Sequence, residues 1–468
     1  MLTRGMVTDR ALRVVRTLAA APEALTRTAL PELAGISAPT LQRALKDLRD
    51  AGWLTEAENG EARRLGAPVY LSRRAGIVVG VDVGRGHMRA VAADIHGRPL
   101  SSEPACLEGE VDLENRGAAI LESVLDLILD ALSLASVGHE PPFTVEEVRS
   151  IAVGVPTPVD ADGKVVGMFL PQWTETPLRD ILLAKLKTYA KDTQQRLHRE
   201  FQLTIAKDAD LGALSAWRDF EVEQADAGSS PSVILRERDA PPQEGAAEDD
   251  ADIAQRAGPR QKILVFLKAS HGIDASIVCD GTIVAGMQGI AAQIGHLWVP
   301  AAAEVDLSGF HDVFRAPAAP ECQRCGRVGC LESVASGRAL LRQLERLYGV
   351  NAPSSVDELT REVNQQQTEK PDSRNAVIAS AVRIGTVLAE VARLADPTRV
   401  VVGGLLATTG DTFISPLRSA YSNGAFSGLE SEVVPVPPSR VRRMELEGAV
   451  ELARRNLRFG KAVAAPAA

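Results

Sequence analysis

The sequence feature that most constrains the fold is a short cysteine-rich segment, Cys322–Glu332, which holds three of the chain's five cysteines. Two thiolates separated by two residues can both reach one tetrahedral Zn²⁺, and glycines permit the tight turns that bring a third thiolate back to it. The thiolates belong to Cys322, Cys325 and Cys330, and the turns to Gly326 and Gly329. The clustering favours one structural zinc site over three unrelated thiols.

Four-coordinate structural zinc requires one more ligand than these cysteines supply. The nearest histidines in the sequence are His296 and His311, and spacing alone leaves both open. With either histidine, the segment is expected to fold as a tight loop around the ion.

Length and composition favour a multidomain protein without a membrane span. A chain of 468 residues is too long for one compact core, so two or three domains are expected. Hydrophobic residues make up 45% and charged residues 24%, with no apolar run of about 18 residues and no signal-like apolar segment. Five cysteines with three clustered do not form a disulfide framework, which favours a reducing cytoplasm.

The charge is unevenly distributed along the chain. The net charge is −9, but residues 1–76 carry 12 Lys and Arg against 8 Asp and Glu. A small basic module is therefore joined to a larger acidic body, and only the module has the charge expected of a nucleic-acid-binding part.

Residues 1–73 are predicted to form a winged helix-turn-helix. Apolar periodicity indicates helices over 10–21 and 26–34, with Thr26 capping the second, and a third helix that begins after Ser37. The exposed groups of that third helix suit base edges and phosphates in the major groove, and they include Ser37, Thr40, Gln42, Arg43 and Lys46. A hairpin from Trp53 to Leu71 forms the wing, with Arg63 and Arg64 near its tip. The turn, the polar third helix, the wing and the local positive charge are all typical of a DNA-binding domain. DNA binding is therefore favoured over a three-helix interaction domain with no DNA role.

The body is predicted to be a duplicated α/β structure. Two apolar strands, 77–83 and 263–267, each open a series of strands and helices, which indicates two lobes, 75–205 and 206–468, with a cleft between them. Helices are expected over 113–134, 176–200, 209–217, 333–348, 355–365, 375–394 and 443–456. Residues 221–256 contain ten acids against three bases and few large apolar residues, which indicates a disordered acidic insertion over about 221–260.

The motifs of the body resemble those of the ROK family (repressors, open reading frames and sugar kinases), in its repressor branch with an N-terminal winged helix. The cysteine segment is close to the family's C-x-C-G-x-x-G-C-x-E pattern, with one extra residue between the first two cysteines. Gln293–His296 matches E-x-G-H, and Lys207-Asp208 matches a paired Asn-Asp. The resemblance covers nearly the whole chain apart from the acidic insertion.

This resemblance implies a two-lobed, actin-like (ribonuclease H-like) ATPase fold for the body. It also implies a zinc site formed by His296, Cys322, Cys325 and Cys330, which selects His296 over His311. The loop between His296 and Cys322 is longer than is usual in the family.

The phosphate-binding turns of the family's kinases are altered in this chain. The first, Asp82–His87, lacks the second adjacent glycine and the threonine, and the second, Ser270–Ser276, retains one glycine. The third, Gly403-Gly404, is followed by Leu405. Side chains then lie where the backbone must approach a phosphate, and Asp274 adds a repelling charge. ATP binding is expected to be lost, and Asp208 would be the catalytic base only in a kinase.

The resemblance also implies an effector site made of Lys207, Asp208, Gln293, His296 and Glu332. Lys207 replaces an asparagine and Gln293 replaces a glutamate, whose carboxylate would accept sugar hydroxyls more strongly than an amide. Lys207 would either pair with Asp208 and fill the site, or recognise an acidic or phosphorylated sugar. An altered effector and a lost effector site both stay open.

Together these features predict a DNA-binding transcriptional regulator, most simply a repressor. As a homodimer or homotetramer it would bind a palindromic operator, and a sugar or sugar-phosphate effector would shift its lobes. One alternative is a ROK sugar kinase that carries an extra DNA-binding domain. Another is an effector-independent regulator whose body serves only for dimerisation.

Overall fold

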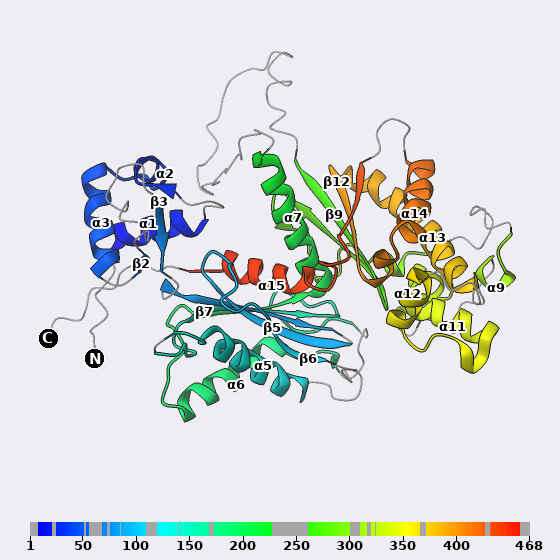
Figure 1. The fold of residues 1–468 in the computed structure, drawn as a ribbon, viewed down its shortest axis with the longest axis horizontal. Coiled ribbons are helices and arrows are strands. Elements are labelled where there is room, and N and C mark those ends of the chain that lie inside the picture. Colours follow the sequence, from blue (N-terminus) through cyan, green and yellow to red (C-terminus); the bar gives the residue numbers. More distant parts are fainter. Residues whose placement is uncertain are drawn as a thin grey trace, which may run out of the picture.

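The computed structural model describes residues 8–20, 25–50, 53–55, 68–72, 75–84, 86–108, 119–139, 141–167, 173–226, 261–299, 309–315, 320–322, 324–365, 371–425 and 431–458. They form a small N-terminal module and two lobes, each built on its own sheet (Figure 1). No helix within these ranges is both long and apolar enough to cross a membrane.

The N-terminal module consists of three helices and a small antiparallel sheet. The helices are α1 (Asp9–Ala20), α2 (Leu30–Leu33) and α3 (Ala38–Asp50), and the strands are β1 (Leu25–Thr26), β2 (Leu54–Thr55) and β3 (Pro68–Leu71). The sheet order is β1-β3-β2, so the first strand pairs with the wing. The predicted core side chains of the third helix, Leu41, Leu45 and Leu48, are all buried.

The second helix of the module begins later than predicted, at Leu30 rather than after Thr26. Thr26 lies in β1, where it pairs with Pro68 of β3. Its hydroxyl still accepts a hydrogen bond from the Ala29 amide at 3.3 Å. Pairing with a strand distant in sequence has replaced the first turn of the expected helix, and the threonine caps the turn that precedes it.

The two lobes contain sheets of identical order and strand direction. The first sheet runs β6-β5-β4-β7-β8 and the second β11-β10-β9-β12-β13. In each, the first three strands in sequence pair antiparallel and the last two add in parallel. The strands of the first sheet are β4 (Ile77–Val83), β5 (His87–Asp94), β6 (Ala105–Glu108), β7 (Val148–Val155) and β8 (Gln202–Lys207). Those of the second are β9 (Ile263–Ala269), β10 (Ile273–Cys279), β11 (Thr282–Ile283), β12 (Arg399–Gly403) and β13 (Glu432–Pro435). The predicted duplication is confirmed.

Each sheet is covered by helices on both faces, which explains why its central strands are apolar throughout. The outer face of the first sheet is covered by α5 (Ile120–Ala135) and α6 (Leu178–Asp192). The outer side of the second lobe holds α10 (Leu331–Ala335), α11 (Gly337–Tyr348), α12 (Val356–Asn364), α13 (Pro371–Ala395) and α14 (Asp411–Gly424). Short elements are α9 (Asp312–Arg315) and the 3₁₀ turns η5 (Ile294–His296), η6 (Gly349–Asn351) and η7 (Leu405–Thr409).

Two helices lie between the sheets and pack against each other: α7 (Asp208–Asp226) and α15 (Met444–Arg455) (Figure 1). Trp217 and Phe220 of α7 pack on the second sheet, and Leu446 and Val450 of α15 pack on the first. The helices meet so closely that a Cβ on Gly448 would lie 1.8 Å from the carbonyl oxygen of Leu211. The end of the chain therefore returns to the first lobe. The lobe boundaries predicted from the sequence stay a prediction.

Several elements differ from the sequence prediction. Ser336 separates α10 from α11, where one helix over 333–348 was expected. Neither α14, which contains Pro416, nor the four-residue strand β13 was predicted. The predicted acidic insertion begins within α7, which extends to Asp226, and 227–260 lie outside the described residues.

Candidate metal centre and effector cleft

The predicted zinc ligands lie together in the structure. The ligand atoms of His296, Cys322, Cys325 and Cys330 are all within 4.8 Å of one another, and Cys322 Sγ lies 3.8 Å from His296 Nδ1. Ligands at about 2.3 Å from a tetrahedral ion are spaced by roughly 3.8 Å, so the cluster has the size of a zinc site. His311 lies outside it, exposed at the start of α9, where its Nδ1 accepts from the Val313 amide at 3.3 Å.

The loop is shaped by backbone pairing and by left-handed glycines. Bridges join Glu321 to Val328 and Trp298 to Cys330, so the loop closes on itself and then onto the segment that carries His296. Gly326 and Gly329 have φ of 70° and 82°, as the sequence predicts for turns that other residues would strain.

The protonation of the cluster suits a bound cation. Burial, with Arg324 and Arg327 nearby, lowers the pKa of His296 to about 4, so its imidazole is neutral and keeps a lone pair for a metal. Burial raises the pKa of the Cys330 thiol to about 12. A thiolate there needs a cation beside it, and a borderline-soft ion such as Zn²⁺ fits a donor set of three sulfurs and one nitrogen.

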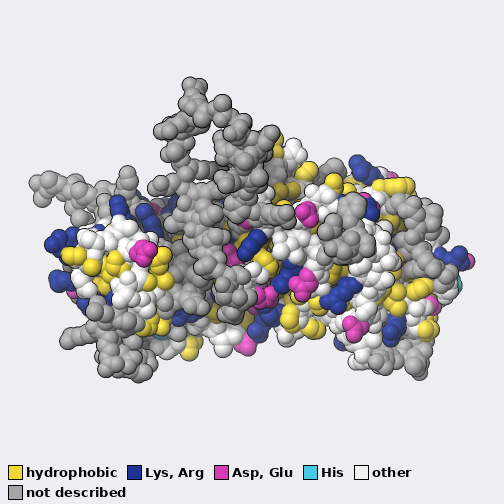
Figure 2. All heavy atoms as spheres, turned by 90° about the horizontal axis from the view of Figure 1, so that it is seen from above, with side chains coloured by type: hydrophobic (Ala, Val, Ile, Leu, Met, Phe, Trp, Pro, Cys, Tyr) yellow, Lys and Arg dark blue, Asp and Glu magenta, His cyan; other side chains and the backbone are white. Residues whose placement is uncertain are grey.

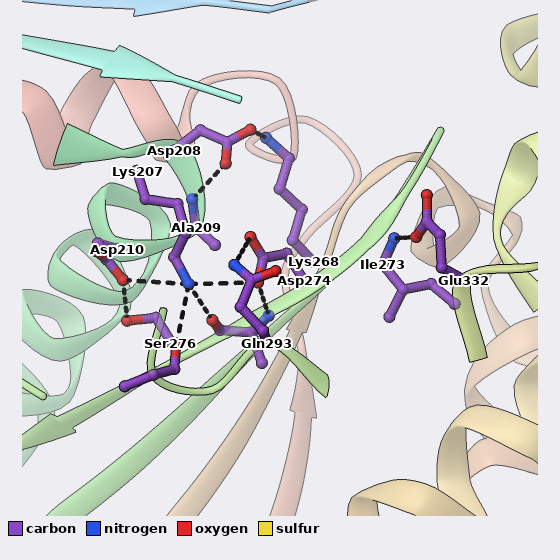
Figure 3. Close-up of polar contacts among 12 residues, drawn as sticks. Lys207, Asp208, Ala209, Asp210, Lys268, Ile273, Asp274, Ser276, Gln293 and Glu332 are labelled. Carbon is purple, nitrogen blue, oxygen red and sulfur yellow. Dashed lines mark hydrogen bonds and ion pairs between the residues drawn. The ribbon is translucent and has the colours of Figure 1, made fainter. Parts of the chain in front are cut away.

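Lys207, at the end of β8, neither pairs with Asp208 nor faces an open site. Its side chain is 1% exposed, and its Nζ lies 3.3 Å from Asp274 Oδ1 and 3.7 Å from Asp210 Oδ1 (Figure 3). It also donates to the carbonyl oxygens of Ala275 at 2.8 Å and Ala291 at 3.4 Å. Burial opposes the charged form, but these carboxylates outweigh it and hold the pKa of Lys207 above its ordinary value. Lys207 thus pairs with Asp274 and Asp210 in place of the predicted Asp208, and recognition of an acidic or phosphorylated sugar stays a prediction.

Asp274 and Gln293 complete the environment of Lys207. Gln293 Nε2 donates to Asp274 Oδ2 at 3.2 Å, so the carboxylate that replaces a phosphate-turn glycine is held by a lysine and an amide. A glutamate at position 293 would repel Asp274, whereas the amide can donate to it. Lys207, Asp274 and Gln293, which all depart from the kinase pattern, therefore form one set of mutually compensating contacts.

Asp208 is engaged through both carboxylate oxygens. Oδ1 accepts from the Ala209 amide at 2.8 Å, and Oδ2 lies 2.7 Å from Lys268 Nζ. The same ammonium lies 2.8 Å from Oε1 of Glu445. Burial opposes the charge of Lys268, but Asp208, Glu445 and Asp82 raise its pKa above the ordinary value. The Lys268 ammonium therefore contacts one of the two oxygens through which Asp208 would act as a general base.

Sequence reasoning missed Lys268 and Glu445. Lys268 is the only charged residue in the strand Ile263–Ala269, and that break in an apolar run was the available signal. Glu445 lies in the first turn of α15, far from the cleft in sequence, and carried no such signal.

Side chains of the protein also contact the first and second turns. Nε2 of His87 lies 2.8 Å from Oδ2 of Asp82, and its ring lies over Gly84, where an added Cβ would be 2.8 Å from the ring carbon Cε1. Glu332 Oε2 accepts from the Ile273 amide at 2.7 Å, which ties the helix after the cysteine loop to the second turn.

The predicted DNA-contacting residues that the structure describes lie on or next to α3. Gln42, Arg43 and Lys46 are exposed, as is Ser37, whose hydroxyl lies 2.8 Å from that of the half-buried Thr40. Figure 2 shows Lys and Arg side chains (dark blue) at the outer end of the module. Arg63 and Arg64 of the predicted wing tip lie outside the described residues.

The fold and the site define a class of protein: a winged helix joined to a two-lobed body of the sugar-kinase type. Residues 251–456 match the model of the ROK family, and residues 7–65 match that of the MarR family. The chain therefore carries a ROK domain and an N-terminal winged-helix domain of the MarR type.

Curated relatives include both repressors and kinases. The xylose repressor of Caldicellulosiruptor bescii is 23% identical over 414 residues, which span 86% of this chain and 84% of the repressor. The xylose repressor of Bacillus subtilis is 20% identical over 418 residues, 89% of this chain and 87% of that protein. The N-acetylmannosamine kinase of Salmonella typhi is 32% identical over 142 residues, 30% of this chain and 40% of the kinase.

Solved structures confirm the fold. A ROK family transcriptional regulator, described as a homolog of the E. coli MLC protein, superposes with a TM-score of 0.59 at 17% identity and covers 95% of this chain and 96% of its own. A ROK glucokinase from Streptomyces griseus gives 0.53 at 22% identity and covers 81% of this chain and all of its own. The predicted fold class, a winged helix-turn-helix followed by an actin-like body, is confirmed.

Proposed function

We propose that this protein is a sugar-responsive transcriptional repressor that binds operator DNA through its winged helix. One observation carries the proposal. The described part of the body keeps the two-lobed fold, while its own side chains occupy the altered phosphate turns and the oxygens of Asp208. We propose that the two lobes still bind a ligand between them and shift when it binds, whereas the body lacks the free base and open turns that phosphoryl transfer requires.

The charge of the cleft supports an uncharged sugar as effector. Two lysines, the buried Lys207 and the half-buried Lys268, are opposed by a larger set of carboxylates. These carboxylates are buried or half-buried, and they belong to Asp82, Asp208, Asp210, Asp274, Glu332 and Glu445. Lys207 is neutralised within this set, so it offers no free charge to a phosphate. We propose Asp208, His296 and Glu332 as the sugar contacts, with Lys207 and Gln293 in supporting positions behind them.

The four clustered residues are proposed to hold one structural Zn²⁺. When bound, the ion would cross-link the loop to the segment of His296 and leave no open position for catalytic water. Glu332 follows Cys330 by two residues, so the ion would hold Glu332 against the second turn. The repressor is further proposed to act in the cytoplasm as a homodimer or homotetramer.

Selection of bound DNA from a random pool tests this function. We expect an enriched palindromic sequence bound at about 10⁻⁸ M or tighter at physiological salt. Anisotropy titrations of that DNA with D-xylose, D-glucose and N-acetylmannosamine should then find a sugar that weakens binding. Failure to enrich any sequence would contradict the proposal.

A sugar kinase with an extra DNA-binding module is the second proposal, favoured by the 32% identity to N-acetylmannosamine kinase. A coupled ATPase assay with the same sugars separates the two. The repressor proposal expects no turnover above background, whereas turnover that Asp208→Asn abolishes would establish the kinase.

A further inference from the structure

The helix α15 extends from the cleft to the DNA-binding module. Its first turn holds Glu445 at the ion pair with Lys268, and Leu457, two residues past its end, packs against the core of the module. Twelve helical residues at 1.5 Å each span about 18 Å. Figure 1 shows α15 along the inner face of the first sheet, pointing toward the module.

At the cleft end, one ammonium joins three elements. Lys268 extends from β9 of the second lobe, Asp208 begins α7, and Glu445 belongs to α15, which packs on the first lobe. These side chains are between 7% and 20% exposed, so the pairs are little screened by solvent. A ligand that hydrogen-bonds to Asp208 competes with Lys268 for the same oxygen. That competition changes the pair between Lys268 and Glu445.

Along its length, α15 has no room to deform locally. A Cβ on Gly80 of β4 would lie 2.8 Å from the backbone nitrogen of Val450, and Gly448 touches the backbone of α7 in the same way. Glu451 pairs with Arg454 at 2.7 Å and with Arg455 at 2.6 Å, which stabilises the last turn. Displacement at Glu445 is therefore transmitted along the helix as a whole.

At the module end, α15 meets residues that hold the winged helix in place. Ile95, fully buried in the turn after β5, belongs to the module's core cluster, and Gly97 of the same turn faces Val450 and Arg454. Two arginines of the first lobe stack on module rings: Arg98 lies 5.9 Å from the Tyr70 ring and Arg149 5.2 Å from the Trp53 ring. The position of α15 and that of the module are thus set by shared contacts.

From these contacts we infer that Lys268 and Glu445 are positioning residues that couple the effector cleft to the winged helix through α15. This inference rests on the proposed function, because it names the residues through which the effector would regulate DNA binding. The ion pair between Lys268 and Glu445 holds α15 in one position, and an effector that engages Asp208 perturbs that pair through Lys268.

Hydrogen exchange of the full-length protein tests the coupling without any sugar. The variants Lys268→Met and Glu445→Gln remove the pair, and Glu445→Asp keeps the charge but shortens the side chain. The matched control is Glu447→Gln on the same helix, whose carboxylate pairs with Arg440 and accepts from Ser215 at 3.2 Å instead. Thermal melting confirms that each variant is folded.

We expect amide exchange in residues 8–72 to rise about fivefold or more in the Lys268 and Glu445 variants, and to stay at the wild-type rate in the control. Unchanged exchange in the module overturns the inference. An equal rise in amide exchange in Glu447→Gln also overturns the inference. The loss of any ion pair on α15 would then be enough to loosen the module.

Operator binding gives a second, separable readout. On the DNA selected with the wild-type protein, Glu445→Gln should reduce the effect of the active sugar while Glu447→Gln retains it, and retention by both would count against the coupling. If the wild-type protein selects no DNA, the proposed function fails, and the exchange experiment still decides the coupling.

Discussion

At the scale of single residues, the cleft is defined by charges that compensate one another. Lys207 replaces an asparagine of the family pattern and Asp274 replaces a glycine, and the two side chains meet at 3.3 Å in a largely buried site. Without Lys207, Asp274 would be a largely buried carboxylate without its counterion, and removing one partner of a buried pair costs about 3–5 kcal/mol. The pair therefore accounts for two residues that each look unfavourable in the sequence.

Reverting the lysine tests this compensation. Lys207→Asn should lower the free energy of unfolding by about 3–5 kcal/mol, because Asp274 and Asp210 lose their counterion. Adding Asp274→Gly should recover part of that loss. Urea unfolding measures both, with Lys164→Asn as the control, since Lys164 forms an exposed pair with Glu175. Additive losses in the double variant would argue against compensation.

The cysteine cluster makes an equally local prediction. Cys325→Ser should weaken zinc binding by at least about 100-fold, because a hydroxyl replaces one of the thiolate ligands. Metal content after dialysis against a mild chelator measures this change. Cys279→Ser is the matched control, since Cys279 is a free cysteine outside the cluster. One retained equivalent of zinc in Cys325→Ser would refute the assignment.

At the scale of elements, α3 has the features of a recognition helix. The Ser37 hydroxyl accepts from the Thr40 amide at 3.4 Å and caps the first turn. Asp47 fixes the helix to the start of α1 by accepting from Thr8 Oγ1 at 2.7 Å and Arg10 Nε at 3.2 Å. Gln42 and Arg43 of the same helix stay exposed and are available to the major groove.

Removing one side chain from that face tests its register. Arg43→Ala should weaken binding to the selected operator by about 1–3 kcal/mol and reduce discrimination against scrambled DNA. The control is Arg13→Ala, which removes the same charge from an exposed position on α1. Equal effects of the two variants on operator and scrambled DNA would show that Arg43 contributes only general charge.

At the scale of the whole molecule, one chain carries one winged helix, so a palindromic operator needs two chains. Two recognition helices on one face of B-DNA are separated by about one helical turn, or 34–36 Å. In the proposed homodimer, the two-lobed bodies would set that separation, and rotation between their lobes would alter it.

Scrambling one half of the operator tests the dimer. Each mismatched base pair costs about 1–3 kcal/mol, so replacing a half-site should abolish specific binding by the intact dimer. Light scattering of the complex should give two chains per operator. A single chain that binds either half-site as tightly as the whole would contradict the homodimer.

The sequence by itself determined those parts of the protein whose causes are local. The helix after Ser37 follows from its cap and the spacing of its leucines, and the cysteine loop follows from ligands within nine residues and two glycines. The apolar strands of both lobes could be read from composition, because each is buried on both faces.

Only the tertiary structure decided how the cleft is filled, and the reason is distance along the chain. Lys207 meets Asp274 across 67 positions, and Lys268 meets Asp208 across 60. Glu445 reaches the same ammonium because α15 returns from the end of the chain to the first sheet. Charge pairs of this kind depend on how the two sheets and the helices α7 and α15 pack together. A local sequence pattern cannot predict that packing.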